Sequence, residues 1–97
     1  MIILLNILTV DPADQASLLE LLRANTDTVV ATLDGWISTQ LIASTDGTRV
    51  VICSEWRDAG AVDAMRRHPR MAAYFPRITA LATFDSIAGD VVHSRSA

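Results

Sequence analysis

Hydrophobic residues fall into runs whose spacing changes from strand-like to helix-like and back along this 97-residue chain. Residues 2–10 carry Ile, Leu and Val on both alternating faces, which predicts a strand covered on both sides. Asp11 is a candidate helix N-cap, and Pro12 fits the first helical position. Apolar residues then recur at helical spacing as far as Leu33, so we expect one amphipathic helix of about five turns.

Two further runs, residues 36–44 and 48–56, are rich in β-prone residues and flank the sequence Asp46-Gly47. This pattern predicts a β-hairpin closed by a two-residue type I′ turn. Side-chain alternation then directs one face of the hairpin towards the helices and leaves Trp36 on the other face. The pairs predicted for the helix-facing side are Ile37 with Trp56, Thr39 with Ser54, and Leu41 with Ile52.

The C-terminal half of the sequence predicts more helix and a final strand. Asp58 is a candidate N-cap for a helix that runs to about Arg67, and Pro69 stops or restarts that helix. Pro76 is expected to kink or end the continuation, and the last strand is expected around residues 90–93.

The resulting order, β-α-β-β-α-β, is typical of the ferredoxin-like α+β fold, with helices on one face of an antiparallel four-stranded sheet. Residues 1–97 have the length of a single domain. The first strand is apolar on both sides and 51 % of the chain is hydrophobic, so the second face of the sheet needs a cover. A second copy packed sheet against sheet is the simplest cover, and we therefore expect a homodimer.

The net charge, the apolar runs and the cysteine content limit the classes of partner and the cellular compartment that we expect. The net charge of −3 argues against a nucleic-acid partner, because such proteins are usually basic. No stretch approaches the roughly 20 apolar residues of a membrane span, so we expect no membrane partner. The one cysteine, Cys53, cannot form an internal disulfide, which favours a reducing cytoplasm.

Asn6 is the first candidate site residue, because it is the one side-chain amide in the apolar run of residues 1–10. Leaving such a group buried without partners costs about 1–3 kcal/mol, so the fold must satisfy it or turn it towards a cavity. Trp56 ends another apolar strand, and our hypothesis is that it faces the same cavity. Each residue also has a structural interpretation, as a hydrogen-bonding strand residue and as a core aromatic.

Further candidates come from the other strands and the later helices. The helix-facing residues Thr39, Ile52 and Ser54 are candidate substrate contacts. Tyr74 could roof a flat ligand or fill the core. His68, in an arginine-rich segment that would attract a phenolate or carboxylate, is a candidate acid–base group pointing into the cleft under the helices. Its alternative is a solvated helix end.

Common cofactor and catalytic patterns are missing from the sequence. It has no Gly-rich phosphate loop, no metal-ligand spacing of Cys or His, and no nucleophile–base pair. We therefore expect no flavin, nicotinamide or metal. Any chemistry would come from the ligand, with the protein supplying a dry, shaped pocket and a few dipoles.

Five segments, spread in order over nearly the whole chain, resemble the antibiotic-biosynthesis monooxygenase family. They are Asn-Ile-Leu-Thr-Val-Asp-Pro-Ala-Asp-Gln at 6–15, Asp-Gly-Trp-Ile-Ser at 34–38, Asp-Gly-Thr-Arg-Val-Val at 46–51, Glu55-Trp56, and Ala-Thr-Phe-Asp at 82–85. Members of that family are dimeric ferredoxin-like α+β barrels. They include cofactor-free oxygenases that convert anthrone-type aromatic polyketides to quinones with O2 as co-substrate. The resemblance implies such an enzyme here, with a polycyclic phenolic substrate.

The resemblance also implies roles for individual residues. The family pocket has an Asn on the first strand, an Asn and a Trp four residues apart on the third strand, and in some members a later Tyr. Asn6 and Trp56 match, which implies that Asn6 holds a substrate oxygen and that Trp56 orients the ring system. Ile52 and Val62 stand where the second Asn and the Tyr would fall. Ile52 cannot hydrogen-bond a substrate carbonyl or a peroxide.

Two other functions remain open at this stage. The departures at Ile52 and Val62 favour a binding or cyclase-like accessory protein that shapes a polyketide without redox chemistry. Haem degradation is the second, since relatives with this fold use an Asn, a Trp and an iron-ligating helix His. Asn6, Trp56 and His68 supply those residue types here.

Overall fold

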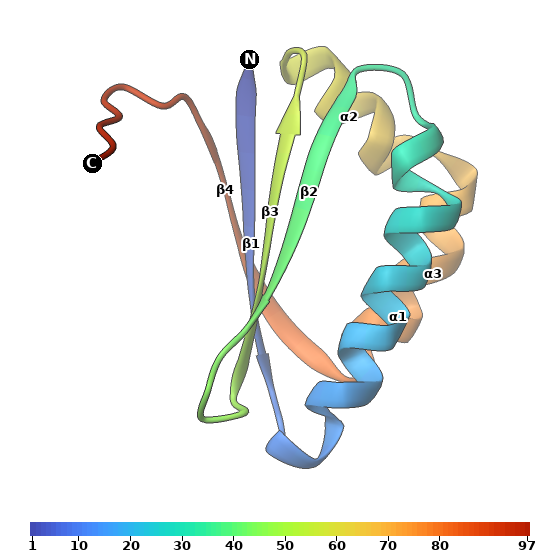
Figure 1. The fold of residues 1–97 in the computed structure, drawn as a ribbon. Coiled ribbons are helices and arrows are strands. Elements are labelled where there is room, and N and C mark those ends of the chain that lie inside the picture. The colour runs from blue at the N-terminus through green and yellow to red at the C-terminus, as the bar shows by residue number, and fades with distance from the viewer.

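The computed structural model describes residues 1–97 and contains one four-stranded antiparallel sheet in the order β2-β3-β1-β4. The helices lie together on one face of the sheet, and the other face is uncovered (Figure 1). The predicted ferredoxin-like α+β fold is confirmed. Its elements are β1 (Ile2–Val10), α1 (Gln15–Thr28), β2 (Trp36–Ala43), β3 (Arg49–Trp56), α2 (Ala59–Arg67), α3 (Pro69–Thr79) and β4 (Ala82–Gly89).

The first helical region is divided, where the sequence predicted one continuous helix to Leu33. Asp11 caps its start as predicted, and the Asp11 carboxylate accepts a hydrogen bond from the backbone N–H of Ala13 at 2.9 Å. Helix α1 ends at Thr28 and a short 3₁₀ turn follows it. The Thr28 hydroxyl donates back to the carbonyl of Ala24 at 2.7 Å, and such back-bonding, next to β-branched residues, weakens a helix end.

The β2–β3 connection is longer than the predicted two-residue turn. The last backbone pair joins the N–H of Ser44 to the carbonyl of Arg49 at 3.0 Å. Gly47 has φ +80°, and no residue other than glycine has a positive φ. Asp46 is therefore outside the type I′ conformation, which needs a positive φ at both central residues. Its carboxylate instead accepts a hydrogen bond from the N–H of Thr48 at 3.0 Å.

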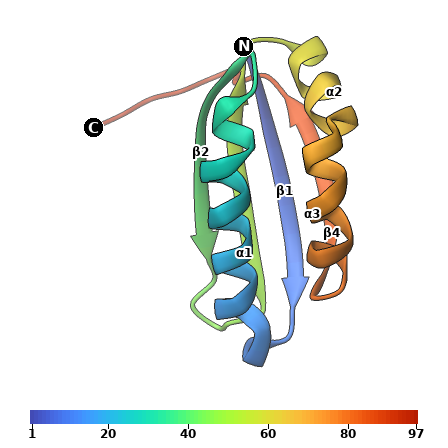
Figure 2. The ribbon, with the colours of Figure 1, turned by 90° about the vertical axis from the view of Figure 1, so that its right-hand side faces the viewer.

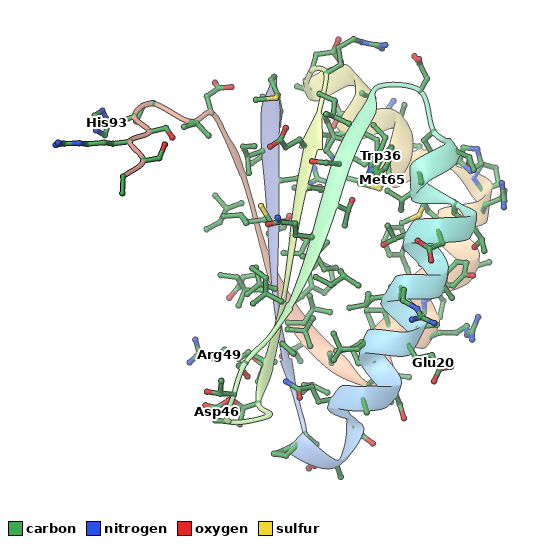
Figure 3. The ribbon with its side chains drawn as sticks, viewed as in Figure 1. Glu20, Trp36, Asp46, Arg49, Met65 and His93 are labelled. Carbon is green, nitrogen blue, oxygen red and sulfur yellow. The ribbon has the colours of Figure 1, made fainter.

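Most of the predicted hairpin register survives this longer loop. Thr39 pairs with Ser54 as predicted, and the pairing of Leu41 with Ile52 is also confirmed. The prediction is wrong at the other end, because an irregularity between Trp36 and Ser38 sets Trp36 opposite Trp56. The extra residue turns Trp36 towards the helices, where Figure 3 shows it near Met65, and leaves Ile37 47 % exposed.

One expectation for the C-terminal half is wrong and another is narrowed. Pro76 was expected to kink or end the helix, and an end is excluded because α3 continues to Thr79. The last strand is Ala82–Gly89 and not residues 90–93, which have no regular structure. β4 pairs with β1 as far as Ile3 opposite Gly89. Because β1 begins at Ile2, residues beyond Gly89 have almost no partner strand left.

The core lies between the sheet and the helices, with α1 and α3 side by side over the strands (Figure 2). It consists of two clusters of buried side chains, one that includes Leu4 and Trp56 and one that includes Leu8 and Leu22. Burying one such side chain fully contributes about 1.5–3 kcal/mol. The gap between the clusters follows from the strand period, because Asn6 is the residue between Leu4 and Leu8 on this face.

Candidate functional site

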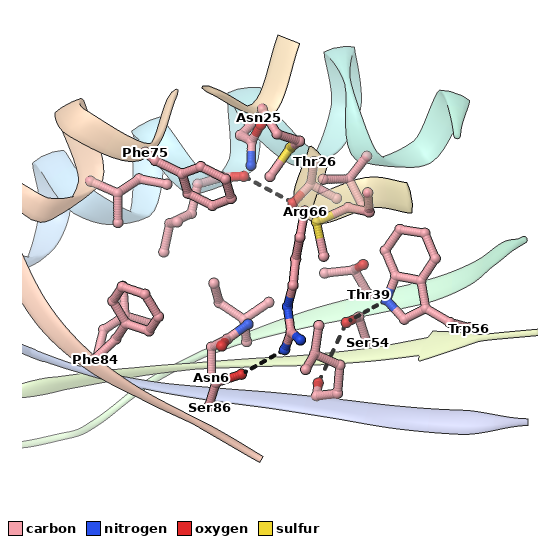
Figure 4. A pocket seen from close by; sticks show the side chains of 18 residues that line it. Asn6, Asn25, Thr26, Thr39, Ser54, Trp56, Arg66, Phe75, Phe84 and Ser86 are labelled. Atoms are coloured by element: carbon pink, nitrogen blue, oxygen red, sulfur yellow. Dashed lines mark hydrogen bonds between the residues drawn. The ribbon is translucent and has the colours of Figure 1, made fainter. Parts of the chain in front are cut away.

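A cavity of about 460 Å³ lies between the sheet and the helices and borders both core clusters (Figure 4). Of its 18 lining residues, 11 are hydrophobic. A mostly apolar cavity of this size, with a few polar groups, is typical of a small-molecule site. Its polar groups come from both the strands and the helices, and they differ in whether the protein itself satisfies them.

Asn6 lies at the centre of β1, between Ile52 on β3 and Ser86 on β4. Its side chain is half-buried, faces the helices and lines the cavity. The amide makes no hydrogen bond within the chain, unlike most buried polar side chains. Asn6 is therefore placed to bind whatever occupies the cavity.

Trp56 lines the same cavity but has no free polar atom. The indole N–H donates to the Ser54 hydroxyl at 3.0 Å, and that hydroxyl donates to the backbone carbonyl of Leu4 at 3.4 Å. Trp56 is 1 % exposed and Ser54 is 4 % exposed. The relay fixes the indole ring, so Trp56 offers the cavity an apolar surface and not a donor.

Thr39 and Ile52 also line the cavity, as their helix-facing register requires. The Thr39 hydroxyl accepts a hydrogen bond from the indole N–H of Trp36 at 2.9 Å. Ile52 lies directly beside Asn6 in the β1–β3 ladder. The wall next to Asn6 is therefore apolar on the β3 side.

Arg66 is the only charged residue that lines the cavity, and sequence analysis did not single it out from its arginine neighbours. It lies in the last turn of α2, and its guanidinium donates to the Ser86 hydroxyl at 3.3 Å. Figure 4 shows the Asn6 amide, the Ser86 hydroxyl and the Arg66 guanidinium together on the sheet side. The hydrogen bond between Arg66 and Ser86 joins α2 to β4, which are distant in the sequence, so only the tertiary structure reveals it.

Asn25 on α1 also lines the cavity and was missed by sequence analysis. It is 6 % exposed, and its side-chain oxygen has no hydrogen-bond partner. The sequence did carry a signal, because Asn25 follows Leu22 by three residues and so interrupts the apolar stripe of the helix. Its neighbour Thr26 is satisfied, since the Thr26 hydroxyl donates to the carbonyl of Leu22 at 2.9 Å.

His68 and Tyr74, both predicted to face the cavity, lie outside it. His68 is the N-cap of α3, and its ring nitrogen Nδ1 accepts a hydrogen bond from the backbone N–H of Arg70 at 3.2 Å. The Tyr74 hydroxyl lies 3.3 Å from that of Thr28, and the Arg77 guanidinium lies 5.3 Å from the centre of the Tyr74 ring. His68 therefore does not line the cavity in which the haem hypothesis requires an iron ligand.

The acidic side chains with lowered pKa values also lie outside the cavity. A hydrogen bond from Arg57 lowers the pKa of Asp34, and the two form an ion pair at 3.0 Å. The N–H of Ala61, which Asp58 caps, lowers the pKa of the Asp58 carboxyl. These groups stabilise helix ends and loops, so the charge within the cavity comes from Arg66 alone.

No group of three or more His, Cys, Asp or Glu side chains lies close enough together to hold a metal ion. None of the helices has the length and apolar character that crossing a membrane requires.

Comparison with known proteins gave consistent similarities. The sequence profile described as antibiotic biosynthesis monooxygenase matches residues 1–77. Tetracenomycin-F1 monooxygenase of Streptomyces glaucescens is 29 % identical over 91 residues, which are 94 % of this chain and 81 % of that protein. SnoaB of Streptomyces nogalater, described as a cofactor-independent oxygenase, has a TM-score of 0.81 at 21 % identity, covering 96 % of this chain and 94 % of SnoaB. Rv0793 of Mycobacterium tuberculosis has a TM-score of 0.82 at 24 % identity, covering 98 % of each chain.

Proposed function

This chain belongs to the antibiotic biosynthesis monooxygenase family, and on that basis we propose that it oxidises a polycyclic phenolic compound to a quinone with O2 and no cofactor. The substrate class is that of an anthrone-type aromatic polyketide. Support comes from the similarity to a tetracenomycin monooxygenase and to SnoaB. The observation that carries the proposal is the apolar cavity in which the unpaired Asn6 amide lies beside Arg66.

The reaction needs a ligand that can lose a proton and then an electron. Asn6 donates a hydrogen bond to a substrate oxygen, and the positive charge of Arg66 favours the phenolate or enolate form of that oxygen. The proton passes to solvent, because no carboxylate or imidazole lines the cavity. The anion transfers one electron to O2, and the resulting radical and superoxide combine into a peroxide at the reacting carbon. Loss of water from the peroxide leaves the quinone carbonyl, so one CH2 group and one O2 yield one C=O and one H2O.

Trp56 has a positioning role in this proposal. Its ring is fixed by the hydrogen bond to Ser54, so it can hold a flat aromatic ligand in one orientation through apolar contact alone. Phe75 from α3 and Phe84 from β4 supply further aromatic surface to the cavity. Ordered apolar walls also exclude water from the reactive intermediates.

A second candidate function is binding or cyclisation of a polyketide without oxidation. The specific observation in its favour is Ile52, which lies beside Asn6 and gives that side of the cavity no hydrogen-bond donor. A peroxide would then have fewer groups to stabilise it, and losing one well-placed donor can lower a rate by about 10²–10³. The mass of the product separates the two functions, because cyclisation changes only the water content.

We also propose that the working form is a cytoplasmic homodimer joined through the uncovered sheet face. Ile42 and Ile87 lie on that face and are 50 % and 57 % exposed. Val92, beyond the last strand, is 95 % exposed. A second copy covering these side chains would remove apolar surface from water. Cys53, a free thiol, is consistent with a reducing compartment.

The oxygenase proposal is tested by incubating the purified protein with dithranol, a soluble anthrone, while following O2 uptake and quinone absorbance. We expect turnover above the uncatalysed rate, and a loss of about 10²-fold in Asn6→Leu, which keeps the side-chain size but removes the amide. Glu20→Gln, on the exposed face of α1, is the matched control and should keep full activity. Background rates for the wild type, or an unchanged mass apart from water, would reject oxygenation.

A further inference from the structure

We propose that Asn25 is a second polar contact of the cavity, which hydrogen-bonds to the oxygen added to the substrate during the reaction. This inference rests on the proposed function and extends it to a residue on the helix side. The family pocket described above has no counterpart of Asn25, because none of the residues named for it falls on α1. Asn25 is buried, its side chain has no hydrogen-bond partner within the chain, and it lies across the cavity from Asn6.

The fold gains no hydrogen bond from burying the side chain of Asn25. Its side chain is 6 % exposed, and the oxygen atom is fully buried with no hydrogen-bond partner. Its backbone carbonyl is satisfied, because it accepts from the N–H of Val29 at 3.0 Å. The unsatisfied part is therefore the side chain alone. Leucine would fit this position between Leu22 and Val29 on the apolar stripe and would leave nothing unpaired.

The amide is also aimed at the ligand space. Figure 4 shows Asn25 on the helix side of the cavity with its nitrogen turned towards the interior, and Asn6 on the sheet side. The nitrogen is the donor of the amide, so in this orientation Asn25 presents a hydrogen-bond donor to the ligand. Thr26, the next residue, donates its hydroxyl proton to the carbonyl of Leu22 and so has no donor for a carbonyl oxygen of the ligand.

Two amides on opposite sides of a cavity match a flat ligand with oxygens on opposite edges. An anthrone such as dithranol has oxygens on one edge only, and its opposite edge carries the CH2 group that reacts. The corresponding anthraquinone has an additional carbonyl at that carbon. If Asn6 and Arg66 hold the oxygenated edge, the reacting carbon lies towards Asn25, and the new carbonyl oxygen can accept a hydrogen bond from the Asn25 side-chain N–H, which faces the cavity. An interaction that forms only as the reaction proceeds accelerates it more than one present from the start.

The test compares the affinities of two ligands that differ at this edge. Dithranol and its anthraquinone are titrated, without O2, into the wild type, Asn25→Leu and the control Thr26→Val, with tryptophan fluorescence as the readout. We expect Asn25→Leu to lose about tenfold in affinity for the anthraquinone, the value of one neutral hydrogen bond, and to bind dithranol as before. We expect Thr26→Val to bind both ligands like the wild type.

The stability of Asn25→Leu is an independent measurement. If Asn25 had a structural role, this substitution would lower the stability of the protein. Asn25→Leu removes an unsatisfied buried group, so it should unfold at the same urea concentration as the wild type or a higher one. In turnover with dithranol, kcat should fall in Asn25→Leu while KM stays constant. Asn25→Ala, which also removes the amide, should show the same difference between the ligands if Leu overpacks the site.

Three results would overturn the role of Asn25: an equal loss of affinity for both ligands, no loss for either, or marked destabilisation by leucine. These results leave the oxygenase proposal standing, because the wild type would still bind and turn over dithranol. If the wild type binds neither ligand, the substrate class is wrong and the role of Asn25 fails with it. Binding of both ligands without oxidation would reject the oxygenase, and the role of Asn25 towards an added oxygen would fail with it.

Discussion

The polar residues around the cavity divide into two groups with opposite hydrogen bonding (Figure 4). The closed relay consists of Trp56, Ser54 and the backbone carbonyl of Leu4, in which each donor has an acceptor. The open amides are Asn6 and Asn25, whose side chains make no hydrogen bond within the chain. Asn25 is as buried as Ser54, at 6 % and 4 % exposed, so burial alone does not decide whether a polar side chain here is paired.

The difference shows which polar residues the fold uses for itself. A buried group that is fully hydrogen-bonded fixes its neighbours and adds to stability, whereas an unpaired one lowers stability by about 1–3 kcal/mol. The closed relay therefore holds the wall of the cavity in place. The open amides interrupt that wall, since Asn6 separates the two core clusters on β1 and Asn25 interrupts the apolar stripe of α1. Substitutions in the closed relay should therefore lower the free energy of unfolding, whereas replacing an open amide with an apolar residue should not.

The largest effect is expected for Trp56→Ala, which removes the biggest side chain of the closed relay. Trp56 is 1 % exposed, and deleting a buried tryptophan typically lowers the free energy of unfolding by about 3–5 kcal/mol. Urea denaturation of the wild type and the variant measures the change. Trp56→Phe should lose less, because phenylalanine keeps much of the buried apolar volume. Equal stability of Trp56→Ala and the wild type would show that the relay is not structural.

A smaller loss is expected for Ser54→Ala, which keeps the packing but removes the acceptor of the Trp56 indole. The indole N–H is then buried without a partner, so the free energy of unfolding should fall by about 1–3 kcal/mol. Thr39→Val is the matched variant, because Thr39 accepts from the indole of Trp36 in the same way. Trp36 is only half-buried, so water can replace Thr39 and the loss should be smaller. Equal losses in denaturation would remove burial as the explanation.

The fold could be predicted from the sequence because its hydrophobic periods are regular, and the errors have tertiary causes. The hairpin register was right although the turn was wrong, because Ser44 and Arg49 meet in the same alignment in either loop. No periodic pattern in the sequence marks the irregularity after Trp36. β4 ends where its partner strand β1 begins, and the sequence of β4 alone carries no information about that position.

The strand side of the site could be predicted, because alternation in the hairpin placed Thr39, Ile52 and Ser54 towards the helices. The amides could be predicted only where a polar residue broke an apolar pattern. Asn6 was found by that signal on a strand, and Asn25 carries the same signal on a helix. Tyr74 was chosen where Phe75 lines the cavity, because one residue turns a helix by about 100° and the phase depends on where α3 begins. The contact of Arg66 with Ser86 joins α2 to β4, so no local pattern encodes it.

The smallest effect concerns Asp46 in the β2–β3 loop, which is as fully hydrogen-bonded as the closed relay but lies exposed to water. Hydrogen bonds from the Thr48 side chain and backbone, and from Ser44, lower the pKa of Asp46 from 3.8 to about 2. Since the folded pKa lies below the unfolded value, the stabilisation is complete above about pH 4 and is lost as the pH falls towards 2. The difference in thermal midpoint between the wild type and Asp46→Asn should therefore shrink across that interval. A difference that stays constant from pH 7 to pH 2 would show that the charge of Asp46 contributes nothing, and that hydrogen bonding stabilises this loop in either ionisation state.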